Sequence, residues 1–300
     1  MNNPILSTLP EIVGDSKGIL LDAYGVFWAG NQKGLIPGAR EAMEQLVLQG
    51  KKVGILSNST QLIAKELDKF HSHGLFQDQH FHFILTSGEL AKQVFTEAKF
   101  PFPTPAKKYW LLGHPHPKYS SPHALFENSP FIATPHLSEA DFIYISIPHI
   151  NGEDQIDPHV FMQEIIKVKE SNLPMVCANP DAFAHEGRPP VPVVRQGSIA
   201  KLYESIGGKV FYIGKPAKYA FERALEAFKS HHIHHPEEIL MIGDTPETDI
   251  RGAKLVKMRS ALVTSTGIMA EKVQNKGLIH TLQEIATQDY PDFLIEKLEY

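Results

Sequence analysis

Short apolar runs that end abruptly in polar residues alternate along this chain with segments of helical length. The run GILL at 18–21 is followed by Asp22, and the run VGIL at 53–56 is followed by Ser57 and Asn58. Between them, residues 37–50 carry apolar side chains at helical spacing and end in Gly50, a good helix terminator. Buried parallel strands are typically continuous apolar runs, and strand–helix alternation is typical of a parallel sheet. The sequence therefore predicts an α/β fold.

The same alternation continues to the C-terminus, with one change of character. Residues 100–119 are rich in proline, aromatic residues and histidine, and residues 185–197 form a loop rich in glycine and proline. Regular strand and helix patterns resume after that loop, and the segment from Thr281 onward is predicted to be helical, with a break at Pro291. We therefore expect a core domain in two pieces, 1–88 and 196–300, with an α/β domain inserted at 89–195.

Composition limits the classes of function. The chain has 300 residues, 42% of them hydrophobic, which is enough for a sizeable core, and its net charge of −5 excludes a strongly basic nucleic-acid or membrane binder. The one cysteine, Cys177, lies in an apolar run and is predicted to be a buried strand residue. The N-terminus has no basic segment followed by an apolar stretch, and no run approaches the length of a spanning helix. We expect a cytoplasmic protein with no membrane partner.

Polar groups follow four of the predicted strands, at the ends where parallel sheets bind ligands. They are Asp22, the pair Ser57 and Asn58, Lys215, and Asp244 with Asp249 a few residues later. Taken singly, each has an ordinary interpretation as a helix cap or a surface residue. Together they supply carboxylates for a divalent cation and an ammonium, a hydroxyl and an amide for a phosphate. The set predicts a site for one phosphoryl group and one metal ion.

The chemistry of such a site follows from these residue types. Carboxylates are the hard oxygen ligands that Mg²⁺ prefers, and the metal offsets the repulsion between an anionic nucleophile and an anionic phosphate. An aspartate nucleophile would divide hydrolysis into two displacements through an acyl-phosphate. Lys215 and Ser57 would bind the phosphoryl oxygens during transfer.

The strings DAYGV, ILSNS, GKP and GDTPETD resemble the four motifs of the haloacid dehalogenase (HAD) superfamily, in the superfamily's order. The strings PGAREAMEQL, SNSTQ, GDTPETDIRGA and ANPDAFAHEGRPPVPVVRQGSIAKL resemble subclass IIA, which contains the NagD, p-nitrophenyl phosphatase and pyridoxal phosphatase-like enzymes. The resemblance covers nearly the whole chain. It implies a Rossmann-like parallel-sheet core with a large inserted α/β cap, Mg²⁺ as cofactor, a small phosphorylated metabolite as substrate, and pairing of two copies into a homodimer.

The resemblance also implies a role for each matching residue. Asp22 would be the nucleophile and a metal ligand, and Tyr24 would lend its backbone carbonyl to the metal. Ser57 and Asn58 would contact the phosphoryl group, and Lys215 would bridge the phosphate and the nucleophile. The remaining metal ligands would be Asp244 and, at or near the second shell, Asp249. In the cap, the family's substrate-specificity loop would hold Asn179, Asp181 and His185.

Tyr24 departs from the pattern. Most phosphatases of the superfamily have a second aspartate there, which protonates the leaving oxygen and later activates water. A phenol, with a reference pKa of about 10, is a poor base at neutral pH. Three functions remain open: a phosphatase working through an aspartyl-phosphate, a slow or inactive member that binds a phosphorylated ligand, and a dehalogenase. L-2-haloacid dehalogenases also have Asp-x-Tyr, but they need no metal, whereas this chain keeps Asp244 and Asp249.

Overall fold

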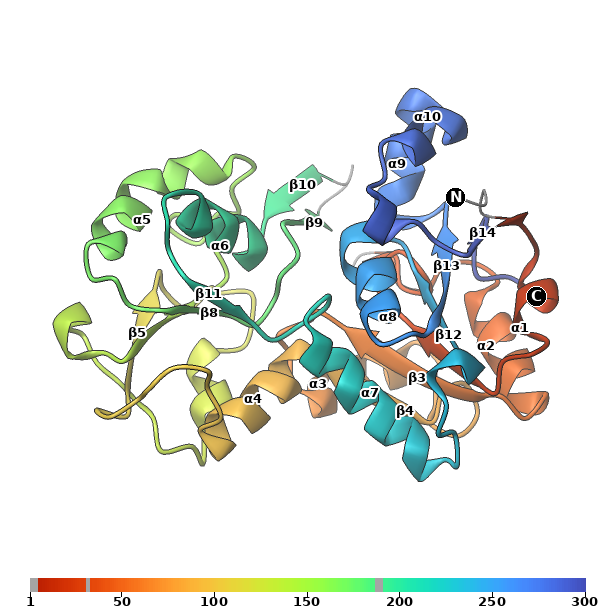
Figure 1. Cartoon of the computed structure of the whole chain (residues 1–300), viewed down its shortest axis with the longest axis horizontal. Helices are drawn as coiled ribbons and strands as arrows, with labels where there is room; N and C mark the ends of the chain where they lie inside the picture. The colour runs from red at the N-terminus through yellow and green to blue at the C-terminus, as the bar shows by residue number, and fades with distance from the viewer. Residues whose placement is uncertain (1–4, 31–32, 187–190) are drawn as a thin grey trace. The chain divides into compact units, whose positions relative to one another are not determined.

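The computed structural model describes residues 5–30, 33–186 and 191–300 of the chain. They form two compact units. The first comprises residues up to 57, 63–85 and 215–300, and the second comprises residues 58–62 and 86–214. Each unit has its own sheet, and each is described by itself (Figure 1).

The first unit is built on a seven-stranded sheet with the order β1-β14-β13-β12-β2-β3-β4. Every pair from β1 through to β3 is parallel. The strands are β1 (Ile5–Leu6), β2 (Gly18–Leu21), β3 (Lys52–Ser57), β4 (Phe83–Thr86), β12 (Ile239–Gly243), β13 (Arg259–Val263) and β14 (Phe293–Ile295).

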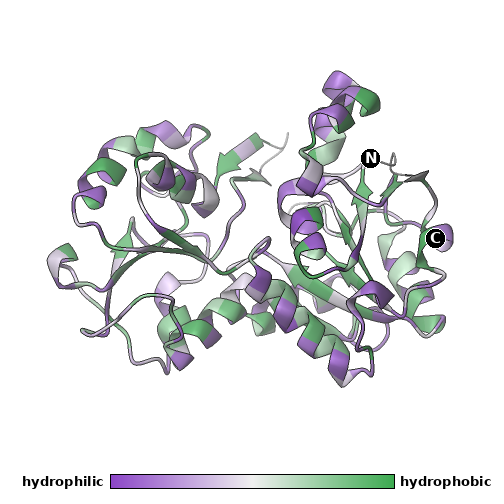
Figure 2. Ribbon diagram, viewed as in Figure 1, coloured by the Kyte–Doolittle hydropathy of each residue, from purple (hydrophilic) through white to green (hydrophobic). Residues whose placement is uncertain are grey.

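The middle of this sheet is apolar because it is covered on both faces. All residues of β2 and β12 are buried, and green, hydrophobic stretches run through the strands of this unit in the hydropathy colouring (Figure 2). A parallel sheet covered on both faces excludes water from its strand interiors, which explains why these strands are continuous apolar runs. The α-helices of this unit are α1 (Leu9–Val13), α2 (Ala39–Leu48), α3 (Ile63–Ser72), α7 (Lys218–Ser230), α8 (Arg251–Leu255), α9 (Gly267–Lys276) and α10 (Leu278–Gln283).

The second unit contains a five-stranded parallel sheet with the order β11-β8-β7-β5-β6. Its strands are β5 (Lys108–Leu112), β6 (Ile132–Ala133), β7 (Phe142–Ile145), β8 (Met175–Cys177) and β11 (Val210–Tyr212). Its α-helices are α4 (Ser87–Glu97), α5 (Met162–Lys169) and α6 (Gln196–Ser205). Cys177 is free and buried in β8, as the sequence predicts.

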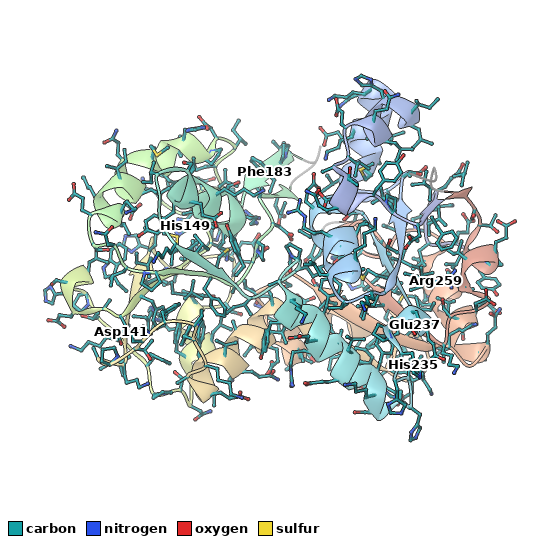
Figure 3. The ribbon with its side chains drawn as sticks, in the orientation of Figure 1. Asp141, His149, Phe183, His235, Glu237 and Arg259 are labelled. Atoms are coloured by element: carbon teal, nitrogen blue, oxygen red, sulfur yellow. The ribbon has the colours of Figure 1, made fainter. Side chains whose placement is uncertain are left out.

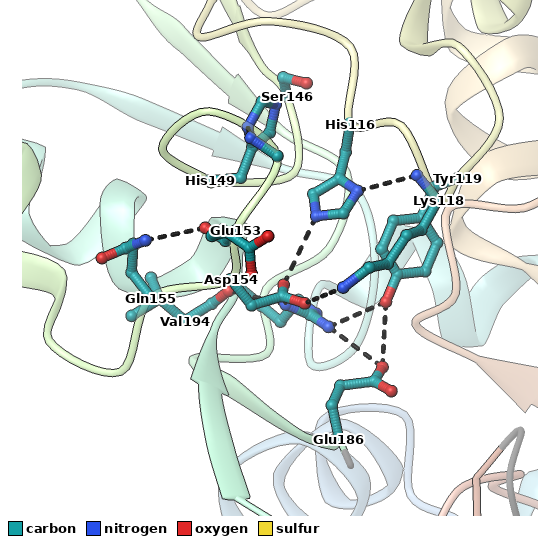
Figure 4. A network of polar contacts seen from close by, with 12 residues as sticks. His116, Lys118, Tyr119, Ser146, His149, Glu153, Asp154, Gln155, Glu186 and Val194 are labelled. Atoms are coloured by element: carbon teal, nitrogen blue, oxygen red, sulfur yellow. Dashed lines mark hydrogen bonds and ion pairs between the residues drawn. The ribbon is translucent and has the colours of Figure 1, made fainter.

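A separate hairpin of the second unit pairs β9 (Phe183–Glu186) with β10 (Val191–Val194) in antiparallel register. A two-stranded ribbon is marginally stable on its own, so it needs anchoring. The buried Arg195 supplies an anchor, with its guanidinium 2.9 Å from Asp154 Oδ1 and 3.1 Å from both Glu186 Oε1 and the Tyr119 hydroxyl. Figure 4 labels these three partners. Tyr119 also donates a hydrogen bond to Glu186 at 3.0 Å.

The structure confirms the predicted α/β class with parallel sheets and corrects three details. The loop predicted at 185–197 is mostly the β9–β10 hairpin and the start of α6. Pro192 is tolerated in β10 because this strand has one partner only and its other edge needs no ladder hydrogen bond. The C-terminal segment predicted as helical ends in strand β14, which pairs with β13 and β1 after Pro291.

The third correction concerns the second predicted domain boundary, between 195 and 196. Helix α6 packs on the core of the second unit through Ile199, Ala200 and Tyr203. Strand β11 then pairs with β8 of the five-stranded sheet. The chain therefore enters the first unit at Lys215, about one helix and one strand later than predicted, because these elements bury their apolar faces in the second unit.

None of the helices among the described residues is both long and apolar enough to cross a membrane.

Candidate active site

Strand register brings three of the predicted residues, Asp22, Ser57 and Asp244, to one edge of the seven-stranded sheet. Leu21 of β2 is level with Ile55 of β3 on one side and with Ile242 of β12 on the other. Asp22 comes next along β2, and its backbone N–H donates to the Ile242 carbonyl at 2.9 Å. Ser57 and Asp244 each lie two residues beyond those partners. All three side chains are largely buried.

Lys215 joins this group from a segment that is not a strand of the same sheet. The sequence predicts that the strand before Lys215 belongs to the core sheet. This prediction is wrong, since β11 belongs to the five-stranded sheet. The Lys215 ammonium nevertheless lies 2.5 Å from Asp22 Oδ1 and 2.7 Å from Asp249 Oδ1. Its side chain is 2% exposed, so both ion pairs are shielded from water.

The two later aspartates are held by the loop that contains them. Asp244 follows β12 directly, and Asp249 lies in the π-helical turn Pro246–Ile250. The Thr245 hydroxyl donates to Asp244 Oδ1 at 2.9 Å, and the Thr245 backbone N–H donates to Asp249 Oδ2 at 3.0 Å. The backbone N–H of Ile268 donates to the second oxygen of Asp244 at 2.7 Å. These bonds fix the direction in which both carboxylates point.

Asp22, Asp244 and Asp249 form a compact acidic cluster. One carboxylate oxygen from each lies within 4.8 Å of those of the other two, and all three residues are buried. Oxygen donors at this spacing suit a hard divalent cation.

Burial dominates the electrostatics of the cluster. It raises the pKa of the Asp22 carboxyl well above its ordinary value; Lys215 opposes this shift, whereas Asp249 and Asp244 add to it. Burial, and then the charge of Asp249, raises the pKa of Asp244 to about 7. Taking charged groups out of water disfavours the ionised form, and neighbouring carboxylates disfavour it further. Asp22 and Asp244 therefore each hold a proton more tightly than a solvent-exposed aspartate does.

Two glycines allow the backbone to approach Asp244 closely. A Cβ atom at Gly25 would lie 2.1 Å from Asp244 Oδ2, and one at Gly267 would lie 1.9 Å from the same oxygen. Both glycines have positive φ, +82° and +66°, which disfavours any residue with a side chain. The Thr266 hydroxyl donates to the Gly25 carbonyl at 2.6 Å and ties the two segments together.

Tyr24, 39% exposed, lies beside a lysine that the sequence did not single out. The Lys69 ammonium, on α3, donates to the Tyr24 hydroxyl at 3.5 Å and lies 5.2 Å from the centre of the Tyr24 ring. It also lies 5.0 Å from the Trp28 ring centre and pairs with the buried Glu66. These contacts fix a cation beside the phenol oxygen.

The remaining predicted residues belong to the second unit. Asn58 is buried, and its side-chain amide donates to Asp181 Oδ1 at 2.7 Å. Asn179 lies in the same loop, where its side-chain oxygen accepts the backbone N–H of Asp181 at 2.9 Å. His185 lies on β9 opposite Pro192, and its side chain falls outside the part that the structure describes.

Two family models match separate segments of the chain. A haloacid dehalogenase-like hydrolase model matches residues 19–120, which include Asp22 and Ser57. A HAD-hydrolase-like model matches residues 212–297, which include Lys215, Asp244 and Asp249. The chain belongs to the haloacid dehalogenase-like hydrolases. The family predicted from its four motifs is thereby confirmed.

Named relatives of this hydrolase match it over most of their length. It is 29% identical over 252 residues to the sugar-phosphatase AraL of Bacillus subtilis (strain 168), covering 82% of each chain. It is 25% identical over 309 residues to chronophin of Mus musculus, covering 98% of this chain and 96% of that protein. A haloacid dehalogenase-like family hydrolase from Brucella suis 1330 shares its fold, with a TM-score of 0.78, 19% identity and coverage of 98% and 99%.

Sequence reasoning missed the groups that support the site in this hydrolase. Lys69 and Glu66 are ordinary helix residues in the sequence, and nothing in their spacing points to Tyr24. Thr245 could have been found, because it stands beside Asp244 in the motif. Gly25 and Gly267 carry a weaker signal: each lies four residues after a strand, where a glycine can mark positive φ or a close approach of the backbone.

Replacing Gly267 with alanine is expected to destabilise the fold more than Gly50→Ala. Both glycines have positive φ, +66° and +78°, so both variants strain the backbone by about 1–2 kcal/mol. Only at 267 would the new methyl group meet Asp244, whereas nothing lies within 4 Å at 50. Overpacking adds about 1–3 kcal/mol. Urea denaturation measures both free energies of unfolding, and equal losses would contradict the close approach.

Proposed function

We propose that this hydrolase is a Mg²⁺-dependent phosphatase that acts on a small phosphorylated metabolite through an aspartyl-phosphate at Asp22. The observation that carries the proposal is the buried group in which Lys215 pairs with both Asp22 and Asp249 while Asp244 completes the acidic cluster. The relation to a protein named as a sugar phosphatase supports the phosphatase activity and the class of substrate.

The residues fit the proposed metal ion. Asp22, Asp244 and Asp249 would hold it, together with the backbone carbonyl of Tyr24. The positive charge of Lys215 offsets only part of the negative charge that these three buried carboxylates carry when ionised. The chemistry of the donor set, all hard oxygen, suits Mg²⁺. Mg²⁺, when bound, reduces the repulsion between the Asp22 carboxylate and the phosphate oxygens.

The reaction would proceed in two displacements. In the first, a carboxylate oxygen of Asp22 attacks phosphorus, the bond to the leaving oxygen breaks, and that oxygen takes up a proton. In the second, water attacks phosphorus, the bond to Asp22 breaks and inorganic phosphate is released. Lys215, Ser57 and Asn58 would bind the phosphoryl oxygens, whose charge is redistributed during both steps.

Substituting the proposed nucleophile tests this mechanism. Asp22→Asn is expected to abolish hydrolysis of p-nitrophenyl phosphate in the presence of Mg²⁺, because a carboxamide does not form an acyl-phosphate. Asp292→Asn is a matched control, since Asp292 accepts hydrogen bonds from Ser260 at 2.8 and 2.9 Å, outside the cluster, and should retain activity. Steady-state rates of the purified proteins decide the matter. Wild-type rates in the Asp22 variant would refute the nucleophile.

The leaving group is expected to control the rate, since Tyr24 stands where an aspartate would protonate it. The kcat/KM for p-nitrophenyl phosphate should exceed that for a simple alkyl phosphate, because nitrophenolate leaves without a proton. General acid–base help contributes about 10²–10⁴-fold, so the ratio should be of that order.

Tyr24→Asp is the informative variant for this expectation. It introduces the carboxyl group that most phosphatases of the superfamily have. Hydrolysis of the alkyl phosphate should become faster, so the ratio of the two kcat/KM values should fall. A wild-type ratio near one would show that another group already protonates the leaving oxygen.

Stabilisation by Mg²⁺ is expected to grow with pH. The raised pKa of Asp244, about 7, means that the folded protein binds this proton more tightly than the unfolded chain does. Without metal, the contribution of this group to stability therefore falls as the pH rises from about 4 to about 7. Mg²⁺ binds the deprotonated carboxylates, so it displaces these protons at low pH.

Thermal unfolding at about pH 6 and pH 8, with and without Mg²⁺, measures the effect. The Mg²⁺-induced increase in Tm should be larger at pH 8. In Asp244→Asn the increase should be small at both pH values. An increase in the wild type that does not depend on pH would contradict metal binding at these carboxylates.

A further inference from the structure

Asn58 directly follows Ser57, the last residue of β3, and hydrogen bonds hold both its side chain and its backbone. Asn58 is 4% exposed, and its amide nitrogen donates to Asp181 Oδ1 at 2.7 Å. Its backbone carbonyl accepts the Ser87 hydroxyl at 2.8 Å. A hydrogen bond to a carboxylate is shorter and stronger than one between neutral groups. Asp181 thus restrains the residue that immediately follows a proposed phosphate-binding side chain.

Asp181 is well placed to act as a fixed point because its own loop is held. Its backbone N–H donates to Asn179 Oδ1 at 2.9 Å, and its carbonyl accepts the backbone N–H of Gly197 at 3.0 Å. Gly197 lies in the first turn of α6, which packs on the core of the second unit. The backbone of Asp181 is therefore tied both to its own loop and to the first turn of α6.

The side-chain oxygen of the Asn58 amide lies against the segment that leads to Lys215. A Cβ atom at Gly214 would lie 2.5 Å from Asn58 Oδ1 and 2.7 Å from Pro180 Cδ. Gly214 directly precedes Lys215 in the chain. One amide group therefore touches a residue next to Lys215, while its own backbone continues directly from Ser57.

We propose that Asp181 is a positioning residue, which acts through Asn58 to fix the backbone that presents Ser57 and Lys215 to the phosphoryl group. This inference rests on the proposed phosphatase function and goes beyond it. The family resemblance places Asp181 in the substrate-specificity loop, and the geometry gives its carboxylate a partner inside the protein. A displacement of about 1 Å at a reacting group reduces turnover by as much as 10²-fold, so a restraint on two such groups matters.

The decisive comparison is between two variants of Asp181. Asp181→Ala removes the acceptor, and kcat/KM for p-nitrophenyl phosphate is expected to fall about 10- to 100-fold, as for other residues that support a site from behind. In the same variant, the inhibition constant of inorganic phosphate should rise. Asp181→Asn retains an oxygen that accepts from Asn58, and it should keep most of the activity. If Asn fails as completely as Ala, the carboxylate acts by its charge or touches the substrate, and the proposal is wrong.

A double-mutant cycle shows whether Asp181 acts through Asn58. Asn58→Ala should weaken phosphate inhibition as Asp181→Ala does, and the double variant should be no worse than the more impaired single variant. Losses that multiply would overturn the proposal. Should Asp181→Ala not fold, Asp181→Leu takes its place in the same cycle, because leucine is close to aspartate in size and offers Asn58 no acceptor.

Asp141→Ala is the matched control, because it tests whether the loss of any buried carboxylate in this unit weakens phosphate binding. Asp141, labelled in Figure 3, is a largely buried carboxylate of the same unit that accepts the backbone N–H groups of Ala106 and Lys108 at 3.1 and 3.2 Å. Its loss should lower Tm and leave the inhibition constant of phosphate unchanged. An equal rise in that constant for Asp141→Ala would mean that general loosening explains the effect, which would overturn the proposal.

Failure of the proposed function would look different. If the wild type hydrolyses no phosphate ester, the phosphatase assignment fails, and calorimetric titration with inorganic phosphate and Mg²⁺ still measures phosphate binding in each variant. Weaker binding in Asp181→Ala but not in Asp181→Asn would then support the positioning role alone, and equal binding in all variants would overturn it.

Discussion

The buried Lys215 ammonium is the group on which the candidate site depends. It lies between Asp22 and Asp249, at 2.5 and 2.7 Å, with its side chain only 2% exposed. Removing these charges from water is expensive unless they are paired, and removing one partner leaves an uncompensated buried charge. The ammonium also opposes the effect of burial on the pKa of Asp22. It therefore helps to keep the proposed nucleophile in the ionised form that attacks.

Close backbone approach is the second physical requirement of the site. Asp244 is surrounded by main-chain atoms: Ile268 donates a backbone hydrogen bond to it, and Gly25 and Gly267 leave no room for side chains around it. Backbone groups move less than long side chains, so they orient a carboxylate at little entropic expense. The cluster is thus preorganised for a cation, which agrees with the proposed role of Mg²⁺.

Much of the candidate site could be predicted from local sequence. Asp22, Ser57 and Asp244 follow apolar strands, and the carboxyl ends of adjacent parallel strands necessarily meet at one edge of a sheet. The support around them could not be predicted in this way. Lys69 reaches Tyr24 from a helix 45 residues away in sequence, and Asn58 meets Asp181 across 123 residues. No periodicity encodes such pairs, because each depends on how separate elements pack.

The sequence by itself determined the α/β class, the parallel sheets, the family and the residues that form the acidic cluster with Lys215. These features are written in runs of a few residues, where the local pattern and the physics of buried strands agree. The tertiary structure alone decided that β11 joins the five-stranded sheet, that the C-terminus adds strand β14, and that Asp181 holds Asn58. A short apolar strand fits the edge of either sheet equally well by pattern. Its place is settled by which long-range pairing buries its faces and satisfies its backbone.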